Sequence, residues 1–452
     1  MITAPSQFLT ANVELQKKPI FLVTISNYSR VFTNYATGIA GQYDWIDSFD
    51  DVTLTVSEFD GGSDLGGFNF TVQDFQGLIT ADFPSIVFEG QAVTLKTGFV
   101  GMNQSDFLLL FTGVIDTVAS ANGNLSYTFN CIDTSQILTK VIYTAGDDGF
   151  ATSKDHPRTL NGHPLDILTA ALINEIGLDS SAINLTKINS YRDGLFIAQQ
   201  FSFTIESPPQ AKDFLEKQIL KPLGGYLWTN NEGKIDVNFF YKDVRDSVLS
   251  LNDDNMVGVP LAGQTDLLNQ VSYRFDQQAG SSGDFMTEAV QNYEASIDLY
   301  NQYGQQIVES AGMRAGLQGV FLAVMVSNVF FQRFGLKNLT FPEVIVHWSA
   351  CCVDPGDIID MSSEFVPDRM RGVMGISAML FEVFDRTWDL NNGLVKLRLV
   401  DASYLSRIGT AKVAPDGTPA WTSASGSQKA TYMFQCNDSD KYSDGANAVK
   451  LP

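Results

Sequence analysis

The chain has 452 residues, with 51 Asp or Glu against 29 Lys or Arg, so its formal net charge is −22. Such an acidic chain repels phosphate backbones, which excludes a DNA- or RNA-binding protein of the usual kind. Hydrophobic residues make up 44% of the sequence, enough for sizeable cores, and this excludes global disorder. The acidity fits plain solubility first. It also fits divalent-cation sites, a cationic partner, or a passage through which DNA slides without binding.

The length predicts two to four domains, and the first pattern along the chain is that of β structure. Residues 1–18 are expected to form an N-terminal arm. Residues 19–145 contain short runs rich in Val, Ile, Thr and Phe, such as "PIFLVTISN" and "FLLLFTGVIDTV", separated by breaks such as "DGGSDLGG" and "ANGN". Regularly spaced short strands with such breaks predict an antiparallel, barrel-like β domain over 19–145.

Residues 146–247 show a different pattern and predict a small α+β domain. A first helix is expected from Pro164 to Gly177, because proline suits a first turn and glycine a stop. Its apolar residues recur at helical spacing: Leu165, Leu168, Leu172 and Ile176. A second amphipathic helix is expected to follow an N-cap at Ser207. Two strands joined by a turn at 230–233 complete this unit.

The β pattern returns over 248–403, which predicts a second barrel-like domain containing one helix at about 317–335. The return raises a pseudo-duplication, with two barrel-like units on either side of the α+β module. Residues 404–452 are rich in Gly, Ser, Asp and Ala and poor in core formers, so this C-terminal extension is expected to bind a partner. The predicted fold class is therefore mainly β with an α+β insert.

The sequence offers few groups for catalysis. The three histidines are His156, His163 and His347. The first two share a polar stretch with Asp147, Asp148 and Asp155, which could be a metal or acid–base cluster, although a solvated loop is the simpler interpretation. His347 follows an apolar run and is interpreted as a strand residue. No GxSxG, HExxH, Walker-type or CxxC motif is present.

The remaining candidate groups also have simpler structural interpretations. The cysteines are Cys131, Cys351, Cys352 and Cys436. Their spacing fits no zinc motif, and buried thiols in a reducing compartment are favoured over an iron–sulfur site. The acidic residues of apparent loops are Asp50, Asp51, Asp60, Asp253 and Asp254. No pair of them is singled out as a glycosidase pair, and solvation is favoured over calcium binding. No catalytic, cofactor-binding or metal-binding residue is predicted.

No signal peptide is recognised at the start of the sequence, so assembly in a cytoplasm is expected. The most apolar stretch, Val320–Phe331, is too short to span a bilayer, and no membrane span is predicted.

The order of these blocks resembles that of the tail-tip, or baseplate, hub proteins of long-tailed bacteriophages and gene transfer agents. The resemblance lies in the blocks 21–27, 43–74, 86–118, 161–178, 211–241, 266–276 and 354–386. The first three are similar to the family's first barrel, the next two to its small inserted module, and the last two to its second barrel. None of these blocks is a catalytic fingerprint, and residues 404–452 are not covered.

The resemblance implies a structural virion protein of the tail tip, and not an enzyme. It implies a homotrimer in which two barrels per subunit give a ring of pseudo-sixfold symmetry, joining a sixfold tail tube to a threefold central fibre. The implied partners are the distal tail protein, the C-terminus of the tape-measure protein, and a central fibre or receptor-binding protein. Phage DNA would pass through the ring without specific binding. No cofactor is implied here, because the cysteines are not grouped as in relatives with an iron–sulfur cluster.

Two alternatives remain. One is another structural part of a tail, such as a distal-tail ring or a spike base. The other is a polysaccharide-degrading tail enzyme built on a β scaffold.

Overall fold

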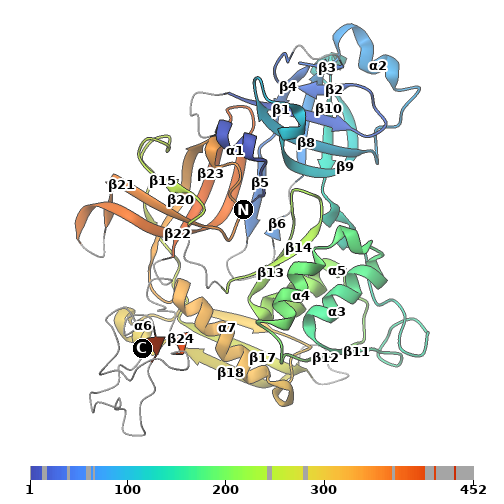
Figure 1. Cartoon of the computed structure of the whole chain (residues 1–452). Helices are drawn as coiled ribbons and strands as arrows, with labels where there is room; N and C mark the ends of the chain where they lie inside the picture. Colours follow the sequence, from blue (N-terminus) through green and yellow to red (C-terminus); the bar gives the residue numbers. More distant parts are fainter. Residues whose placement is uncertain are drawn as a thin grey trace.

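The computed structural model describes residues 2–12, 18–37, 41–56, 63–64, 67–241, 247–277, 284–368, 372–402, 412–413 and 432–433. The fold is mainly β, as predicted, with several sheets and a smaller helical part. Figure 1 shows three lobes: one large sheet at the top, a second at the left, and the α+β part below. Neither large sheet closes into a barrel through pairing of its described strands.

The first sheet has eight strands in the order β3-β2-β1-β8-β9-β10-β7-β4. Their bounds are β1 Pro19–Ile25, β2 Val31–Thr33, β3 Gln42–Tyr43, β4 Ile46–Phe49, β7 Phe68–Gln73, β8 Ala92–Phe99, β9 Leu108–Ala121 and β10 Ser126–Ile132. Side chains alternate between core and solvent along β7, because successive residues of a strand point to opposite faces. The inward face is aromatic, with the rings of Phe70 and Phe129 stacked 4.9 Å apart.

The second sheet runs in the order β15-β21-β22-β23-β20-β16. The bounds are β15 Ser250–Leu251, β16 Gly263–Gln264, β20 Leu339–His347, β21 Ile358–Asp368, β22 Val373–Asp389 and β23 Leu394–Asp401. Strands β22 and β23 form an antiparallel hairpin. Two further strands, β5 (Val52–Val56) and β6 (Ser63–Asp64), come from the first part of the sequence, and β5 pairs antiparallel with β22.

The two large sheets repeat one strand order. In the first, β8-β9-β10-β7 lie side by side, and in the second, β21-β22-β23-β20 do. In each sheet, three strands that are consecutive in the chain lie side by side and pair antiparallel. The fourth strand, which comes just before them in the chain, pairs antiparallel with the last of the three. The longest strand of each sheet, β9 or β22, takes the same place in this order. The topology therefore agrees with the pseudo-duplication raised by the sequence pattern.

The α+β part contains two antiparallel strand pairs and the predicted first helix. The pairs are β11 (Arg158–Gly162) with β12 (Phe201–Ile205), and β13 (Gly225–Thr229) with β14 (Ile235–Phe239). Helix α3 (Pro164–Ala170) continues as π-helical turns through Ile176 and ends at Gly177, as predicted. Helix α4 spans Leu185–Asp193.

The expected N-cap of the second helix was wrong. Helix α5 (Ala211–Asp213) starts after Gln210 and continues as π-helical turns through Leu220. The preceding residues form an extended bridge instead, because the Pro209 carbonyl accepts a hydrogen bond from the Ile142 amide at 3.0 Å. Tertiary pairing thus holds the segment after Ser207 out of the helix.

A third sheet packs with the α+β part, although the sequence pattern grouped its strands with the second barrel-like unit. Its order is β18-β17-β19, and it carries helices α6 and α7. The bounds are β17 Gln270–Gln277, β18 Phe285–Asn292, β19 Gln305–Glu309, α6 Glu294–Tyr300 and α7 Gly319–Phe334. Buried residues of β17 and α7 belong to the same core cluster as those of α3 and β13. Strand periodicity shows that a face is buried, but not which neighbour covers it.

The two large sheets share one continuous core. Its members come from both sheets and from the N-terminal residues, including Phe8. The N-terminal arm contains α1 (Ser6–Asn12), which lies between the two sheets (Figure 1). The Ile2 amide donates to the Cys352 carbonyl at 2.8 Å, and the Asn12 amide donates to the Ser349 carbonyl at 3.0 Å. The arm is therefore anchored to the second sheet by hydrogen bonds.

None of the helices in the described ranges is both long and apolar enough to cross a membrane.

Candidate interaction site at the junction of the sheets

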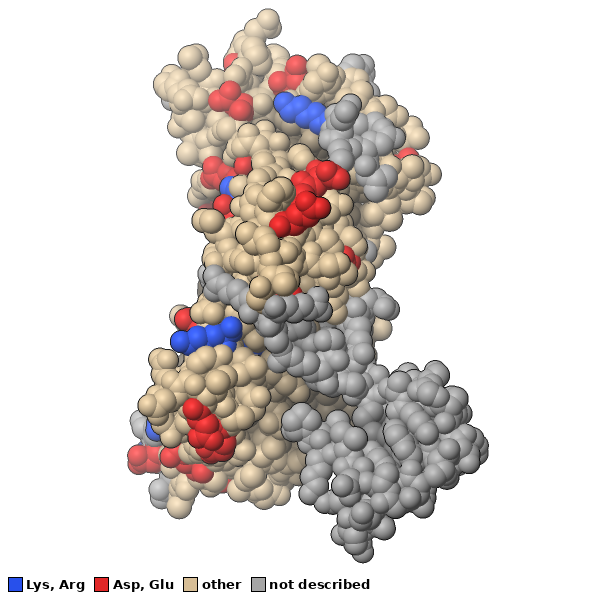
Figure 2. All heavy atoms as spheres, turned by 90° about the vertical axis from the view of Figure 1, so that its left-hand side faces the viewer, with Lys and Arg blue, Asp and Glu red and all other residues tan. Residues whose placement is uncertain are grey.

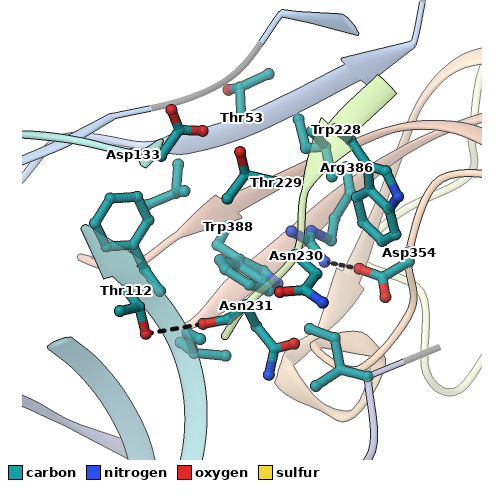
Figure 3. Close-up of a pocket in the computed structure, with 15 residues that line it drawn as sticks. Thr53, Thr112, Asp133, Trp228, Thr229, Asn230, Asn231, Asp354, Arg386 and Trp388 are labelled. Atoms are coloured by element: carbon teal, nitrogen blue, oxygen red, sulfur yellow. Dashed lines mark hydrogen bonds and ion pairs between the residues drawn. The ribbon is translucent and has the colours of Figure 1, made fainter. Parts of the chain in front are cut away.

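Three separate parts of the chain meet at a pocket between the two large sheets (Figure 3). They are β9 of the first sheet, the tip of the β13–β14 hairpin, and β5 with β22, which pair in the second sheet. Their lining residues are Ile2, Val52, Thr53, Leu54, Leu110, Phe111, Thr112, Asp133, Trp228, Thr229, Asn230, Asn231, Asp354, Arg386 and Trp388. At this junction, residues of both large sheets and of the α+β part lie around one pocket.

The hairpin tip is a tight turn that binds the first sheet. The Asn230 side-chain oxygen accepts hydrogen bonds from the amides of residues 232 and 234, both at 3.0 Å. Gly233 has φ +77°, a conformation that glycine adopts without strain. The Asn231 side chain donates to the Leu109 carbonyl at 2.9 Å, and its own carbonyl accepts from the Thr112 hydroxyl at 3.1 Å. The hairpin therefore holds β9 through directed hydrogen bonds.

A buried ion pair lies on the second-sheet side of the junction. Arg386 pairs with Asp354 and also donates to the Val353 carbonyl at 3.2 Å. Its guanidinium lies 3.7 Å from the centre of the Trp388 ring, whose indole N–H donates to the Cys351 carbonyl at 3.1 Å. Burial raises the pKa of Asp354 and lowers that of Arg386, while the attraction between the two opposes both shifts. Each group needs the other to remain charged inside the protein.

A polar cavity of about 510 Å³ adjoins this pocket. Lys187 pairs with Asp236 at 3.3 Å and lies 5.6 Å from the centre of the Trp228 ring. The Asn184 amide donates to the same carboxylate at 3.1 Å. The carboxylates of Asp236 and Asp354 thus both face a cation. These ion pairs help to hold the junction in shape.

The two histidines predicted as a possible cluster, His156 and His163, have different partners in the structure. His156 and Asp148 form an exposed pair with 2.6 Å between Nδ1 and Oδ2, and the bond to His156 lowers the pKa of Asp148. His163 is buried and caps α3 instead: its Nδ1 accepts from the Leu165 amide at 3.1 Å, and its Nε2 bonds the Phe196 carbonyl at 2.9 Å. Within the described ranges no three His, Cys, Asp or Glu side chains gather to hold a metal. His347 ends β20, as predicted for a strand residue.

The three described cysteines are buried free thiols, as favoured from the sequence. Cys351 and Cys352 are adjacent with their sulfurs 3.9 Å apart, and burial raises the pKa of Cys351 well above its ordinary value. Burial also raises the pKa of Cys131, which lies in the first sheet. Cys436 and most of the extension 404–452 lie outside the described residues, as does Asp60.

The acidic side chains are dispersed on the face seen in Figure 2, where Asp and Glu form several separate groups. Individual loop carboxylates have structural partners. Asp50 accepts from the Asn69 amide at 2.7 Å, Asp51 pairs with Lys396 at 3.0 Å, and Asp253 accepts from the residue 364 amide at 3.0 Å. These acidic residues therefore stabilise loops and contacts between strands.

The residues that build the junction were not singled out from the sequence. The turn at 230–233 was predicted, but its docking on β9 was not. Arg386 and Asp354 are 32 residues apart in the chain, and no sequence motif indicated that they form an ion pair.

No family model matches this chain, and no curated protein matches it in sequence. The solved structures to which it is similar include three phage tail proteins. A 43 kDa prophage tail protein from Shewanella oneidensis is 12% identical with a TM-score of 0.47, over 86% of this chain and 99% of that one. A tail protein from Neisseria meningitidis is 11% identical with a TM-score of 0.48, over 86% and 98%. A prophage tail protein from Listeria monocytogenes is 9% identical with a TM-score of 0.44, over 86% and 97%.

These likenesses are distant, and each TM-score lies below 0.5. An assembly role for this chain therefore has to be argued from its own residues and topology.

Proposed function

We propose that this chain is the tail-tip hub of a long-tailed phage or gene transfer agent, a structural protein that forms a trimeric ring between the tail tube and a central fibre. The proposal rests on the sequence blocks that resemble the hub family and on one structural observation, the repeated strand order of the two large sheets. The chain provides surfaces and a rigid junction, and its role is one of assembly.

The repeated strand order supports a symmetry adaptor. Two sheets of like topology in one chain offer two similar outer surfaces, so three chains would offer six. A sixfold neighbour, such as a distal tail protein, could then bind on one side while a threefold fibre binds on the other. The shared core and the docked N-terminal arm hold the two sheets in one orientation, which such an adaptor requires.

The charge of the chain supports passage of DNA through the proposed ring. With a net charge of −22, the protein attracts few phosphate groups, so DNA can move past it with little retention. The purified chain is expected to leave a DNA duplex unbound even at low salt. The end of the tape-measure protein and a receptor-binding protein complete the proposed set of partners.

The oligomeric state tests the proposal. Sedimentation velocity of the purified protein, together with image averaging of intact particles, is expected to show three copies of the 49.6 kDa chain in a ring at the tail tip. A hexamer would instead support a distal-tail ring, and a location away from the tip would remove the hub assignment. Release of sugar from host cell walls, lost on substitution of particular carboxylates, would overturn the structural role.

A further inference from the structure

The third sheet has a long open edge. Strand β18 spans eight residues and pairs only with β17 among the described strands, so alternate backbone N–H and C=O groups along its other side face outward. Natural edge strands are usually protected by Lys, Pro, a bulge or a short length. The sequence of β18, "FMTEAVQN", contains neither Lys nor Pro. The edge is therefore suited to accept another strand.

One face of this sheet is packed and the other is open. Tyr273, Phe275 and Val308 are buried on the inner face, in the core cluster that also contains residues of α7. Figure 1 shows α7 running along this side of β17 and β18. Along β18 the even-numbered residues are exposed: Met286 is 75% and Val290 47% exposed. Two apolar side chains thus stand on the outer face, next to the open edge.

A charged row lies between these two apolar positions. Glu288, Arg274 and Glu309 are paired across β18, β17 and β19, in that order. Arg274 contacts Glu288 at 3.2 Å and Glu309 at 3.5 Å. Two carboxylates share one guanidinium, so the row has a net negative charge, and Glu288 stands at its open end. A cation placed beside Glu288 would balance the row.

We propose that β18 is a docking edge for an extended segment of a partner protein, which adds as a strand and carries an apolar, a basic and a second apolar residue at alternate positions. The basic residue lies beside Glu288, and the apolar residues lie beside Met286 and Val290. Backbone hydrogen bonds supply affinity, and the alternating side chains supply selectivity. The inference does not depend on the hub assignment, because it rests on the edge and its side chains alone.

Two synthetic peptides test the proposal with the full-length protein. One alternates threonine with valine, lysine and valine, and the matched peptide has glutamate in place of the lysine. Fluorescence anisotropy is expected to show that the lysine peptide binds about fivefold more tightly, since a favourable cross-strand charge pair contributes up to about 1 kcal/mol. Glu288→Lys is expected to reverse this order. Equal binding of both peptides, or no binding of either, would overturn the proposal.

Variants at the edge distinguish binding at β18 from non-specific binding to other apolar surfaces. Met286→Lys combined with Val290→Lys is expected to abolish binding of the lysine peptide. Leu125→Lys, which alters an exposed apolar residue in the turn between β9 and β10, is expected to leave binding unchanged. Equal loss with the Leu125 variant would place the peptide elsewhere and refute the docking edge.

Hydrogen exchange distinguishes the possible occupants. The outward amides of β18 are expected to exchange rapidly in the free protein and slowly with the lysine peptide bound. Slow exchange already in the free protein means that the edge is covered by the chain or by a second copy, and this overturns the proposal. In that case, sedimentation velocity compares the unsubstituted protein with the Met286→Lys, Val290→Lys double variant. If only the variant is a monomer, the edge was covered by a second copy of the chain.

Discussion

Arg333 of α7 and Glu382 of β22 form an ion pair in the interior, with 2.8 Å between Nε and Oε2 and side-chain exposures of 1% and 3%. The pair joins the third-sheet unit to the second large sheet, two parts of the chain that the sequence pattern did not separate. A charge buried in this way requires its partner, because water cannot solvate it.

Removal of one member of this pair is expected to destabilise the protein strongly. Arg333→Met or Glu382→Gln should lower the free energy of unfolding by about 3–5 kcal/mol, since each breaks a buried ion pair by removing one of its charges. The double variant Arg333→Met with Glu382→Leu should recover part of this loss. Urea unfolding measures the three variants. Asp213→Ala, which breaks an exposed pair with Lys217, serves as the control and should change stability by less than about 0.5 kcal/mol. A single variant as stable as the control would contradict the prediction.

Phe8 of the N-terminal helix is expected to contribute to the shared core. Phe8 is fully buried and its ring lies 5.4 Å from that of Phe99. Phe8→Ala should cost about 3–5 kcal/mol, because it leaves a cavity between the sheets. Leu9→Ala changes the neighbouring residue, which is 46% exposed, and should be nearly neutral. Thermal unfolding of both variants compares them, and equal melting temperatures would show that the arm adds nothing to the core.

The hairpin tip should stabilise the junction through Asn231. Asn231→Ala removes the hydrogen bond to the Leu109 carbonyl and is expected to cost about 1 kcal/mol. Glu232→Ala, one residue further along the turn, removes only an exposed contact with Lys234 and should have little effect. Hydrogen exchange of β9 is expected to increase in the first variant and to remain unchanged in the second. Unchanged exchange in both would mean that the hairpin does not hold β9.

A pH-dependent contribution is expected from Asp82. It accepts hydrogen bonds from Arg30 at 2.9 Å and from the Tyr28 hydroxyl at 2.8 Å, and the bond to Arg30 is the main reason that its pKa is lowered. The folded protein therefore holds this carboxylate ionised more firmly than the unfolded chain, where the pKa is about 3.9. Its stabilisation is complete above that pH and is lost as the pH falls through the folded-state pKa.

Asp82→Asn should therefore cost about 1 kcal/mol at neutral pH, and the difference from the unsubstituted protein should shrink below a pH of about 4. Urea unfolding at a series of pH values measures this difference. Asp116→Asn, at an exposed position of β9, provides the control. A difference that stays constant down to acid pH would exclude an electrostatic origin.

The sequence by itself determined the local structure of this protein. Alternating Phe and Val along β7, and the helical spacing from Leu165 to Ile176, each predicted an element that is present. Such patterns are local, because they follow from the repeat of a strand or a helix. The return of the β pattern after residue 247 also indicated two related sheets, and the large sheets do share one strand order.

Only the tertiary structure decided which elements pair. Val52–Val56 reads as a strand of the first unit, yet it pairs with β22, and α7 packs with the α+β part. His163 reads as a candidate ligand in a polar stretch, yet it caps a helix. The ion pairs of Arg333 and Arg386 join residues far apart in the chain. The sequence of a strand, or the position of a charged residue, does not show which distant segment it will contact, because pairing depends on the packing of the whole chain.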